Sequence, residues 1–214
     1  VVNPNGAAAY FSNLAQYTTS FLLRYGEVAY LADDGVAING LTFGTSARGS
    51  ISSSTIRHSA RGLWLNGSSG STIAYNNLWG ATAAGLYFTA SPDNDIIGNQ
   101  IFGSNEGISQ NAVSGSDRNL ILGNYSHSHT YAGLYSSQMH NTRIGENWFF
   151  NNAGTGGTPG LYIEGFSNHS VWGNRSYANQ TAGLIIFNSG VTGTVLAQNE
   201  IYCKTSDGIH IQTF

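Results

Sequence analysis

Charged residues are scarce in this sequence. Of its 214 residues, 8 are Lys or Arg and 11 are Asp or Glu, so 9% are charged and the formal net charge is −3. An average soluble domain is about 25% charged. So few cations cannot neutralise a track of phosphates, which excludes a basic nucleic-acid binder. We therefore expect no nucleic acid among its partners.

Cysteine and long apolar runs are also lacking. The single cysteine, Cys203, excludes an internal disulfide framework and a zinc site built from cysteines. No stretch of 18 consecutive apolar residues occurs, so we predict neither a transmembrane helix nor a membrane partner. The sequence begins at Val1 without a methionine or a signal peptide, and we expect a processed chain or a segment of a longer protein.

Glycine and asparagine are plentiful, and they recur in a repeat. Each unit has an apolar residue, an asparagine three positions later, and then a glycine followed by alternating apolar residues. The asparagines are Asn76, Asn99, Asn124, Asn147, Asn174 and Asn199, and a degenerate first unit has Ser54 instead. The glycines are Gly62, Gly85, Gly107, Gly133, Gly160, Gly183 and Gly208, spaced by 23, 22, 26, 27, 23 and 25 residues.

This period is typical of a coil of three short parallel strands. It is shorter than the period of helix-pair repeats, which is about 33 to 47 residues, and each unit contains three short segments that alternate with period two. Stacked coils about 4.8 Å apart would pair every strand edge and bury the apolar columns. We expect the asparagines to adopt the left-handed turn conformation and to bond one another from coil to coil.

The spacing over residues 35–211 resembles that of the right-handed parallel β-helix, the pectin-lyase-like superfamily. In character the sequence is closest to phage tailspikes and to secreted polysaccharide lyases and epimerases. The resemblance implies an all-β fold, a single-stranded right-handed parallel β-helix solenoid of about seven coils over residues 35–214. It also implies a polysaccharide partner, an extracellular location (secreted or on a virion surface) and, as in tailspikes, a homo-oligomer such as a trimer.

Residues 1–34 lie outside the repeat. Tyr10, Leu14, Tyr17 and Phe21 follow helical spacing, which favours a short amphipathic helix that caps the first coil. An irregular first coil is the alternative, and the sequence does not decide between the two.

One face of the predicted rod is rich in aromatic residues, because the second and fourth residues after each glycine should point outward. The second-position column is Trp64, Tyr87, Ser109, Tyr135, Tyr162, Ile185 and His210, and the fourth-position column is Asn66, Thr89, Asn111, Ser137, Glu164, Phe187 and Gln212. Rings beside hydrogen-bonding groups suit sugars. The candidate substrate-binding residues are therefore Trp64, Tyr87, Asn111, Tyr135, Tyr162 and His210. Simple stacking of aromatic residues across strands is the alternative.

A second aromatic column is expected three residues after each asparagine. Its members are Arg57, Trp79, Phe102, His127, Phe150, Tyr177 and Tyr202. Monomers rarely expose a broad apolar surface, so side-by-side association of chains is one explanation. Cross-strand stacking is the other.

Four residues are candidate catalytic groups: Glu164, Glu106, His129 and Arg61. Glu106 and Glu164 are two coils apart, about 10 Å, and five residues apart along the strand, about 16 Å, which exceeds the separation in a glycosidase pair. A lyase needs instead a base and a cation that neutralises the sugar carboxylate. Arg61 could supply that cation, and His129 with Tyr131 could overhang the aromatic strand. A hydrogen-bonded histidine in a polar turn is the alternative for His129.

No metal or cofactor is predicted. His127 and His129 form a His-x-His pair, but no third ligand accompanies them. Asp93 and Asp95 share a turn and could converge on a cation such as calcium, although nothing else in the sequence supports calcium. A solvated turn is the more common role for such a pair.

The sequence thus supports two hypotheses. The first is a polysaccharide-binding and polysaccharide-processing β-helix, a lyase or glycoside hydrolase segment with Glu164 as the best-placed carboxylate. The signature motifs of alginate epimerases, polygalacturonases and pectate-type lyases are absent, so the resemblance assigns no specific activity. The second hypothesis is a non-catalytic stalk or adhesin segment of a phage or cell-surface protein.

Overall fold

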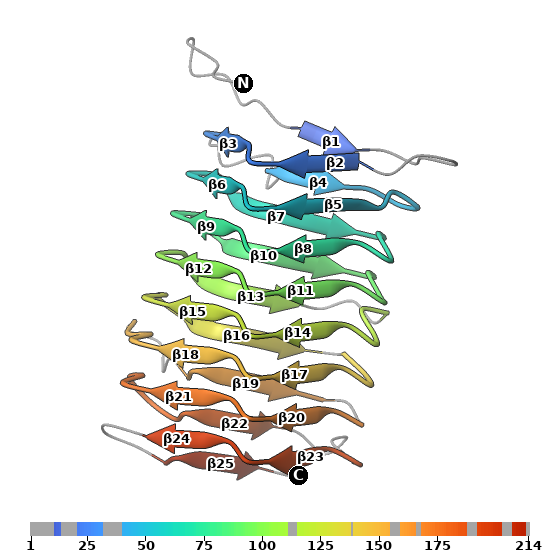
Figure 1. The fold of residues 1–214 in the computed structure, drawn as a ribbon. Coiled ribbons are helices and arrows are strands. Elements are labelled where there is room, and N and C mark those ends of the chain that lie inside the picture. The colour runs from blue at the N-terminus through green and yellow to red at the C-terminus, as the bar shows by residue number, and fades with distance from the viewer. Residues whose placement is uncertain are drawn as a thin grey trace.

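The chain winds into a rod of stacked coils (Figure 1). The computed structural model describes residues 11–13, 21–31, 40–110, 115–137, 139–154, 159–165, 168–187, 192–202 and 207–212. These residues form 25 short strands and contain no helix, and hence none that is long and apolar enough to cross a membrane.

Three parallel sheets run along the rod, and successive strands pass from one sheet to the next (Figure 1). Sheet A contains β1 (Phe11–Asn13), β4 (Leu41–Phe43), β7 (Arg61–Asn66), β10 (Ala84–Thr89), β13 (Glu106–Gln110), β16 (Ala132–Ser137), β19 (Leu161–Glu164), β22 (Leu184–Phe187) and β25 (Ile209–Gln212). Sheet B contains β2 (Phe21–Arg24), β5 (Gly49–Ser52), β8 (Thr72–Ala74), β11 (Asp95–Ile97), β14 (Leu120–Leu122), β17 (Arg143–Gly145), β20 (Ser170–Trp172) and β23 (Val195–Ala197). Sheet C contains β3 (Glu27–Ala29), β6 (Thr55–Arg57), β9 (Asn77–Trp79), β12 (Gln100–Phe102), β15 (Tyr125–His127), β18 (Trp148–Phe150), β21 (Arg175–Tyr177) and β24 (Glu200–Tyr202).

The predicted right-handed parallel β-helix of about seven coils is confirmed. The first 34 residues supply one further turn of strands, with β1 in sheet A, β2 in sheet B and β3 in sheet C. Phe21 begins β2, whereas Tyr10, Leu14 and Tyr17 lie outside the described residues. Within residues 11–13 and 21–31 the structure has strands and no helix, and most of the segment predicted as a capping helix falls outside the described residues.

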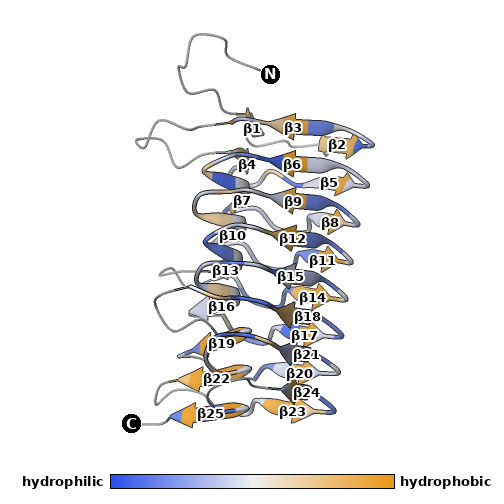
Figure 2. Ribbon diagram, turned by 90° about the vertical axis from the view of Figure 1, so that its left-hand side faces the viewer, coloured by the Kyte–Doolittle hydropathy of each residue, from blue (hydrophilic) through white to orange (hydrophobic). Residues whose placement is uncertain are grey.

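The core is a set of apolar columns inside the coils. Every described coil places one aliphatic residue of sheet B inward, and five of these are fully buried: Ile51, Ile73, Ile96, Ile121 and Ile144. Sheet A adds two inward residues per strand, such as Leu63 and Leu65 in β7. Burial of each such side chain contributes roughly 1.5–3 kcal/mol. Figure 2 shows hydrophobic residues recurring along the stacked strands.

The predicted asparagine ladder is also confirmed. The side-chain amide of each asparagine donates to Oδ1 of the asparagine in the next coil at 2.9–3.0 Å, in the order Asn76, Asn99, Asn124, Asn147, Asn174 and Asn199. The expectation that these asparagines adopt the left-handed conformation is wrong. The preceding residue adopts it instead, for example Tyr75 (φ 56°) and Glu146 (φ 56°). That bend leaves the asparagine side chain inside the coil, where it bonds its neighbours.

The glycine column follows from close packing of backbones. A Cβ atom at Gly107 would lie 2.4 Å from the carbonyl oxygen of Gly133 and 2.0 Å from Ser126 Oγ. A Cβ at Gly62 would lie 2.3 Å from the carbonyl oxygen of Gly85. Only glycine permits this approach of one coil to the next, which explains its recurrence at this position.

Candidate binding face

The outward side chains of sheet A form one continuous surface, called here the sheet A face. Strand register aligns a single column of Trp64, Tyr87, Ser109, Tyr135, Tyr162, Ile185 and His210. In β7 the residues Trp64 and Asn66 are partly exposed, whereas Gly62, Leu63 and Leu65 are buried. The predicted alternation is therefore confirmed in β7, whereas in β13 both Ser109 and Gln110 are buried. Asn111, a candidate substrate-binding residue, lies outside the described residues.

Arg61 lies at the start of β7 with its guanidinium group over two aromatic rings. Its Cζ is 3.8 Å from the ring centroid of Tyr87 and 4.7 Å from that of Trp64. Its Nε is buried and has no hydrogen-bond partner, and no described carboxylate forms a salt bridge with it. Burial lowers the pKa of Arg61, and the nearby Tyr87 and Glu106 oppose that shift. Arg61 is thus a partly buried cation without a salt bridge among the described residues, and the charge of Glu106 acts on it from two coils away.

Glu106 begins β13, and the register places Ala84 between it and Arg61. Burial raises the pKa of the Glu106 carboxyl, while the nearby Ser109 and Arg61 act in the opposite direction. Ser109 itself is fully buried although its position in the column points outward.

Three tyrosines and Glu164 gather lower on the same face. The Tyr135 hydroxyl donates a hydrogen bond to Glu164 Oε2 at 3.2 Å. The ring of Tyr135 stacks on that of Tyr162 at 5.1 Å and meets the edge of Tyr131 at 5.6 Å. Burial, followed by the charge of Glu164, raises the pKa of Tyr135 well above its usual range and that of Tyr162 to about 12. Burial and the charges of Glu106 and Glu164 also raise the pKa of Tyr131.

Most ring faces in this column are covered by other side chains. Tyr135 and Tyr162 are nearly parallel, with 15° between their planes, and Tyr162 also stacks with Phe187 at 6.2 Å. Arg61 covers one face of Tyr87. Consequently a ligand lying on this surface meets ring edges and hydroxyl groups rather than open ring planes. The face therefore offers mainly hydrogen bonds and charge.

The expectation that His129 overhangs the aromatic strand is wrong. His129 is 1% exposed and lies inside the coil, where its Nδ1 accepts the backbone N–H of Ser104 at 3.3 Å. Its Nε2 lies 3.1 Å from both the carbonyl oxygen of Ile101 and Ser126 Oγ. The two side chains of this turn lie on different sides of the coil: His129 is in the interior, whereas Tyr131 contacts Tyr135 on the sheet A face. His129 is thus a hydrogen-bonded interior residue.

The other acidic and histidine candidates do not join this site. His210 is in the sheet A column, but its Nδ1 pairs with Asp207 at 3.0 Å. Of the turn pair Asp93 and Asp95, Asp93 binds Arg118 through both of its carboxylate oxygens at 2.7 Å. Within the described parts of the chain, no group of three or more His, Cys, Asp or Glu residues could hold a metal ion.

The second aromatic column is present on sheet C. Register aligns Arg57, Trp79, Phe102, His127, Phe150, Tyr177 and Tyr202. From Trp79 to Tyr177 the rings stack in succession with centroids 4.6–6.0 Å apart and planes within 16° of parallel. Stacking along the rod thus accounts for this column without a partner chain. Burial lowers the pKa of His127, which lies inside the stack.

Two features of the structure were not predicted from the sequence. The stacking of Arg61 on Tyr87 is a diagonal contact between adjacent strands. Aligning residues at equal positions after each glycine does not predict such a contact. A hollow beside sheet C, lined partly by Tyr30, was missed because the first 34 residues do not repeat.

Comparison with protein families gives one match. The family described as "Periplasmic copper-binding protein (NosD)" matches residues 27–158, which are 132 of the 214 residues. The donor set in the described residues does not fit a copper centre, because no three His, Cys, Asp or Glu side chains converge there. Cys203 lies outside the described residues. No curated protein matches the chain at a significant level.

Comparison with solved structures finds the same architecture. Two crystal structures of the periplasmic alginate epimerase AlgG, a point mutant and the unmodified protein, are 14% identical and have TM-scores of 0.67 and 0.58. They cover 95% and 94% of this chain, and this chain spans 67% of the length of each. A further AlgG mutant has a TM-score of 0.59, and this chain spans 55% of its length. At this identity the likeness concerns the fold. With more than half of its residues matched by one family model and a pectin-lyase-like β-helix along its length, the chain belongs to the NosD family.

Proposed function

We propose that the protein binds a polysaccharide along the sheet A face, with an acidic sugar over Arg61. The observation that carries this proposal is the state of Arg61, whose guanidinium group is held against Tyr87 at 3.8 Å while its buried Nε has no partner. An unpaired, partly buried cation is costly, and a ligand carboxylate would relieve that cost. The rings of Trp64 and Tyr87 hold the guanidinium group in place, and its edge remains available to a planar carboxylate.

The rest of the face supports a long ligand. Coils are about 4.8 Å apart and residues about 3.3 Å apart along a strand. Arg61 in β7 and Glu164 in β19 are therefore separated by four coils, roughly 19 Å along the rod, and by five strand positions, roughly 16 Å across it. One sugar unit cannot touch both, whereas a polymer that crosses the face obliquely can. Tyr131, Tyr135 and Glu164 would then bond the hydroxyl groups of sugars further along.

The fold likeness agrees with this substrate class. The AlgG structures are named as a periplasmic alginate epimerase, and alginate is an acidic polysaccharide. The matched family is named as periplasmic. We therefore place the protein in the cell envelope or outside the cell, and we take acidic polymers as the first candidates.

Binding is the function that this geometry supports best. The register keeps Glu106 and Glu164 two coils and five strand positions apart, so a paired-carboxylate hydrolase is disfavoured. If the face also carries out chemistry, Glu164 with Tyr135 is the best-placed acid and base pair. Elimination from an acidic polymer would then appear as an unsaturated product.

Affinity electrophoresis in gels containing alginate, pectate or a neutral glucan tests the proposal. The protein should be retarded by an acidic polymer, and a Tyr135→Ala/Tyr162→Ala variant should lose that retardation. The matched control is Phe150→Ala/Tyr177→Ala, which removes an equally spaced stacked pair (5.1 Å in both cases) from sheet C. Absence of retardation by every polymer, or equal retardation of the two double variants with unchanged circular dichroism, would overturn the proposal.

A further inference from the structure

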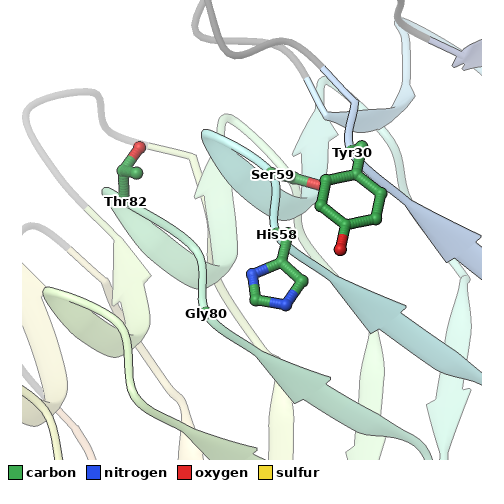
Figure 3. Close-up of a pocket in the computed structure, with 5 residues that line it drawn as sticks. All are labelled: Tyr30, His58, Ser59, Gly80 and Thr82. Atoms are coloured by element: carbon green, nitrogen blue, oxygen red, sulfur yellow. The ribbon is translucent and has the colours of Figure 1, made fainter. Parts of the chain in front are cut away.

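A hollow of about 160 Å³ lies where sheet C turns toward sheet A near the start of the rod. It is lined by Tyr30, His58, Ser59, Gly80 and Thr82. Figure 3 shows the rings of Tyr30 and His58 side by side, Gly80 next to His58, and Thr82 beyond it. None of these residues belongs to the sheet A face.

The hollow results from one missing side chain. Tyr30, His58 and Gly80 occupy the same turn position in successive coils, and all three have a positive φ, of 58°, 50° and 67°. The rings of Tyr30 and His58 stack at 5.1 Å. The next position in this series has no side chain, and a Cβ at Gly80 would lie 3.0 Å from His58 Nδ1. Gly80 therefore leaves room beside the imidazole, whose ring also meets that of Trp79 at 4.3 Å.

The lining is polar but carries no net charge. The phenol oxygen of Tyr30 accepts a hydrogen bond from Arg57 at 3.0 Å, so its own proton can be donated to a ligand. Arg57 is in turn paired with Glu27, which cancels its charge. The imidazole of His58 and the hydroxyl of Thr82 add groups that donate or accept. Such a lining suits a neutral molecule with several hydroxyl groups.

We propose that this hollow is a binding site for one neutral sugar unit, separate from the sheet A face. At about 160 Å³ the hollow is smaller than the roughly 300–1,000 Å³ of ordinary ligand pockets, so a single sugar ring suits it better than a longer segment. The stacked rings of Tyr30 and His58 line one part of the hollow, and Thr82 lies beyond Gly80. The ligand is either a free sugar or the end unit of a chain.

The test is NMR titration of the protein with methyl pyranosides of glucose, galactose and mannose, with glucuronate as the charged comparison. A neutral pyranoside should shift the His58 imidazole signals. A tetrasaccharide of the same sugar then identifies the ligand: tighter binding than that of the pyranoside indicates the end unit of a chain, and weaker binding indicates a free sugar. Gly80→Ala places a methyl group against His58 at the edge of the hollow and should weaken binding at least 10-fold.

Gly103→Ala is the matched control. Gly103 occupies the same turn one coil further on (φ 64°), and a Cβ there would meet nothing closer than 3.9 Å. Alanine is accepted at this turn, since Ala178 occupies it with φ 53°, so both variants should fold. Equal affinity of the two variants, or no neutral pyranoside that shifts the His58 signals, would overturn the proposal. Because Tyr135 and Tyr162 are not involved, the result is independent of binding to the sheet A face.

Discussion

The side-chain amide of Asn99 donates a hydrogen bond to Oδ1 of Asn124 at 3.0 Å, and the same oxygen accepts the backbone N–H of Asn99 at 2.9 Å. One buried oxygen thus satisfies two donors of the preceding coil. The amide of Asn124 also donates to the carbonyl oxygen of Ile96 at 2.9 Å. Each coil therefore depends on its neighbour for the hydrogen bonds of its own turn.

Replacement of Asn124 by alanine should destabilise the protein strongly. It leaves two donors on Asn99 and one acceptor on Ile96 unsatisfied in the interior, at about 1–3 kcal/mol each. We expect the free energy of unfolding in urea to fall by about 3 kcal/mol or more. Asn199→Ala, at the partly exposed end of the ladder, should have a much smaller effect. Equal losses for the two variants would contradict the role assigned to the ladder.

Gly107→Ala should be among the most damaging single substitutions. The added Cβ would overlap the backbone oxygen of Gly133 at 2.4 Å, and backbone cannot move aside cheaply. We expect a loss of about 4 kcal/mol or more in stability, or failure to fold. Gly208→Ala is the comparison, because a Cβ there meets nothing closer than 3.9 Å. A Gly107→Ala protein with the melting temperature of Gly208→Ala would disprove the close-packing explanation.

Arg61→Gln should weaken binding of an acidic polysaccharide while leaving the fold intact. The amide keeps some hydrogen-bonding capacity but removes the charge, so a loss of about 10-fold or more in affinity is expected. Arg143→Gln removes an exposed cation from sheet B and should change the affinity little. Isothermal titration at low salt gives both values. Similar losses for the two variants would show that only overall charge matters.

His129 should make the protein less stable in acid. Burial lowers its pKa from 6.5 to about 3. Between pH 6.5 and pH 3 the unfolded chain therefore binds a proton that the folded chain does not, and the free energy of unfolding falls as the pH is lowered. His129→Asn introduces the residue found at the equivalent positions 152 and 179 and should remove part of this dependence, on the order of a few kcal/mol at pH 4.

Urea unfolding at pH 7, 5.5 and 4.5 measures this effect. His169, whose pKa burial lowers to about 4, should retain a smaller dependence of the same sign in the variant. His210→Asn is the control, because Asp207 raises the pKa of this exposed histidine and its contribution has the opposite sign. A His129→Asn variant with the same pH profile as the parent protein would refute the assignment.

Much of the fold could be predicted because the repeat is local in sequence. Alternation of residues such as Leu63, Trp64 and Leu65 reports which side of a strand is buried. The asparagine and glycine columns report where coils touch. The left-handed conformation was predicted at each asparagine, but the preceding residue adopts it. Either of two adjacent residues can adopt this conformation, and only packing of the asparagine side chain inside the coil selects one of them.

The candidate site was only partly predictable. His129 and Tyr131 are two residues apart in a polar turn, and nothing local indicates that the first is 1% exposed while the second lies beside Tyr135. The cover of Arg61 over Tyr87 and the hollow at Gly80 depend on residues from different coils. Such contacts form between residues more than 20 positions apart, so the chain has no local signal for them.

The sequence by itself determined that the chain is a stack of three-strand coils, because period-two alternation and regular asparagine and glycine spacing permit no other way to bury the apolar columns. Only the tertiary structure decided which outward groups meet: Arg61 with Tyr87, Tyr135 with Glu164, and Tyr30 with His58. The reason is that repeat spacing defines strands and their order, whereas side-chain direction and turn packing define the surface that a ligand meets.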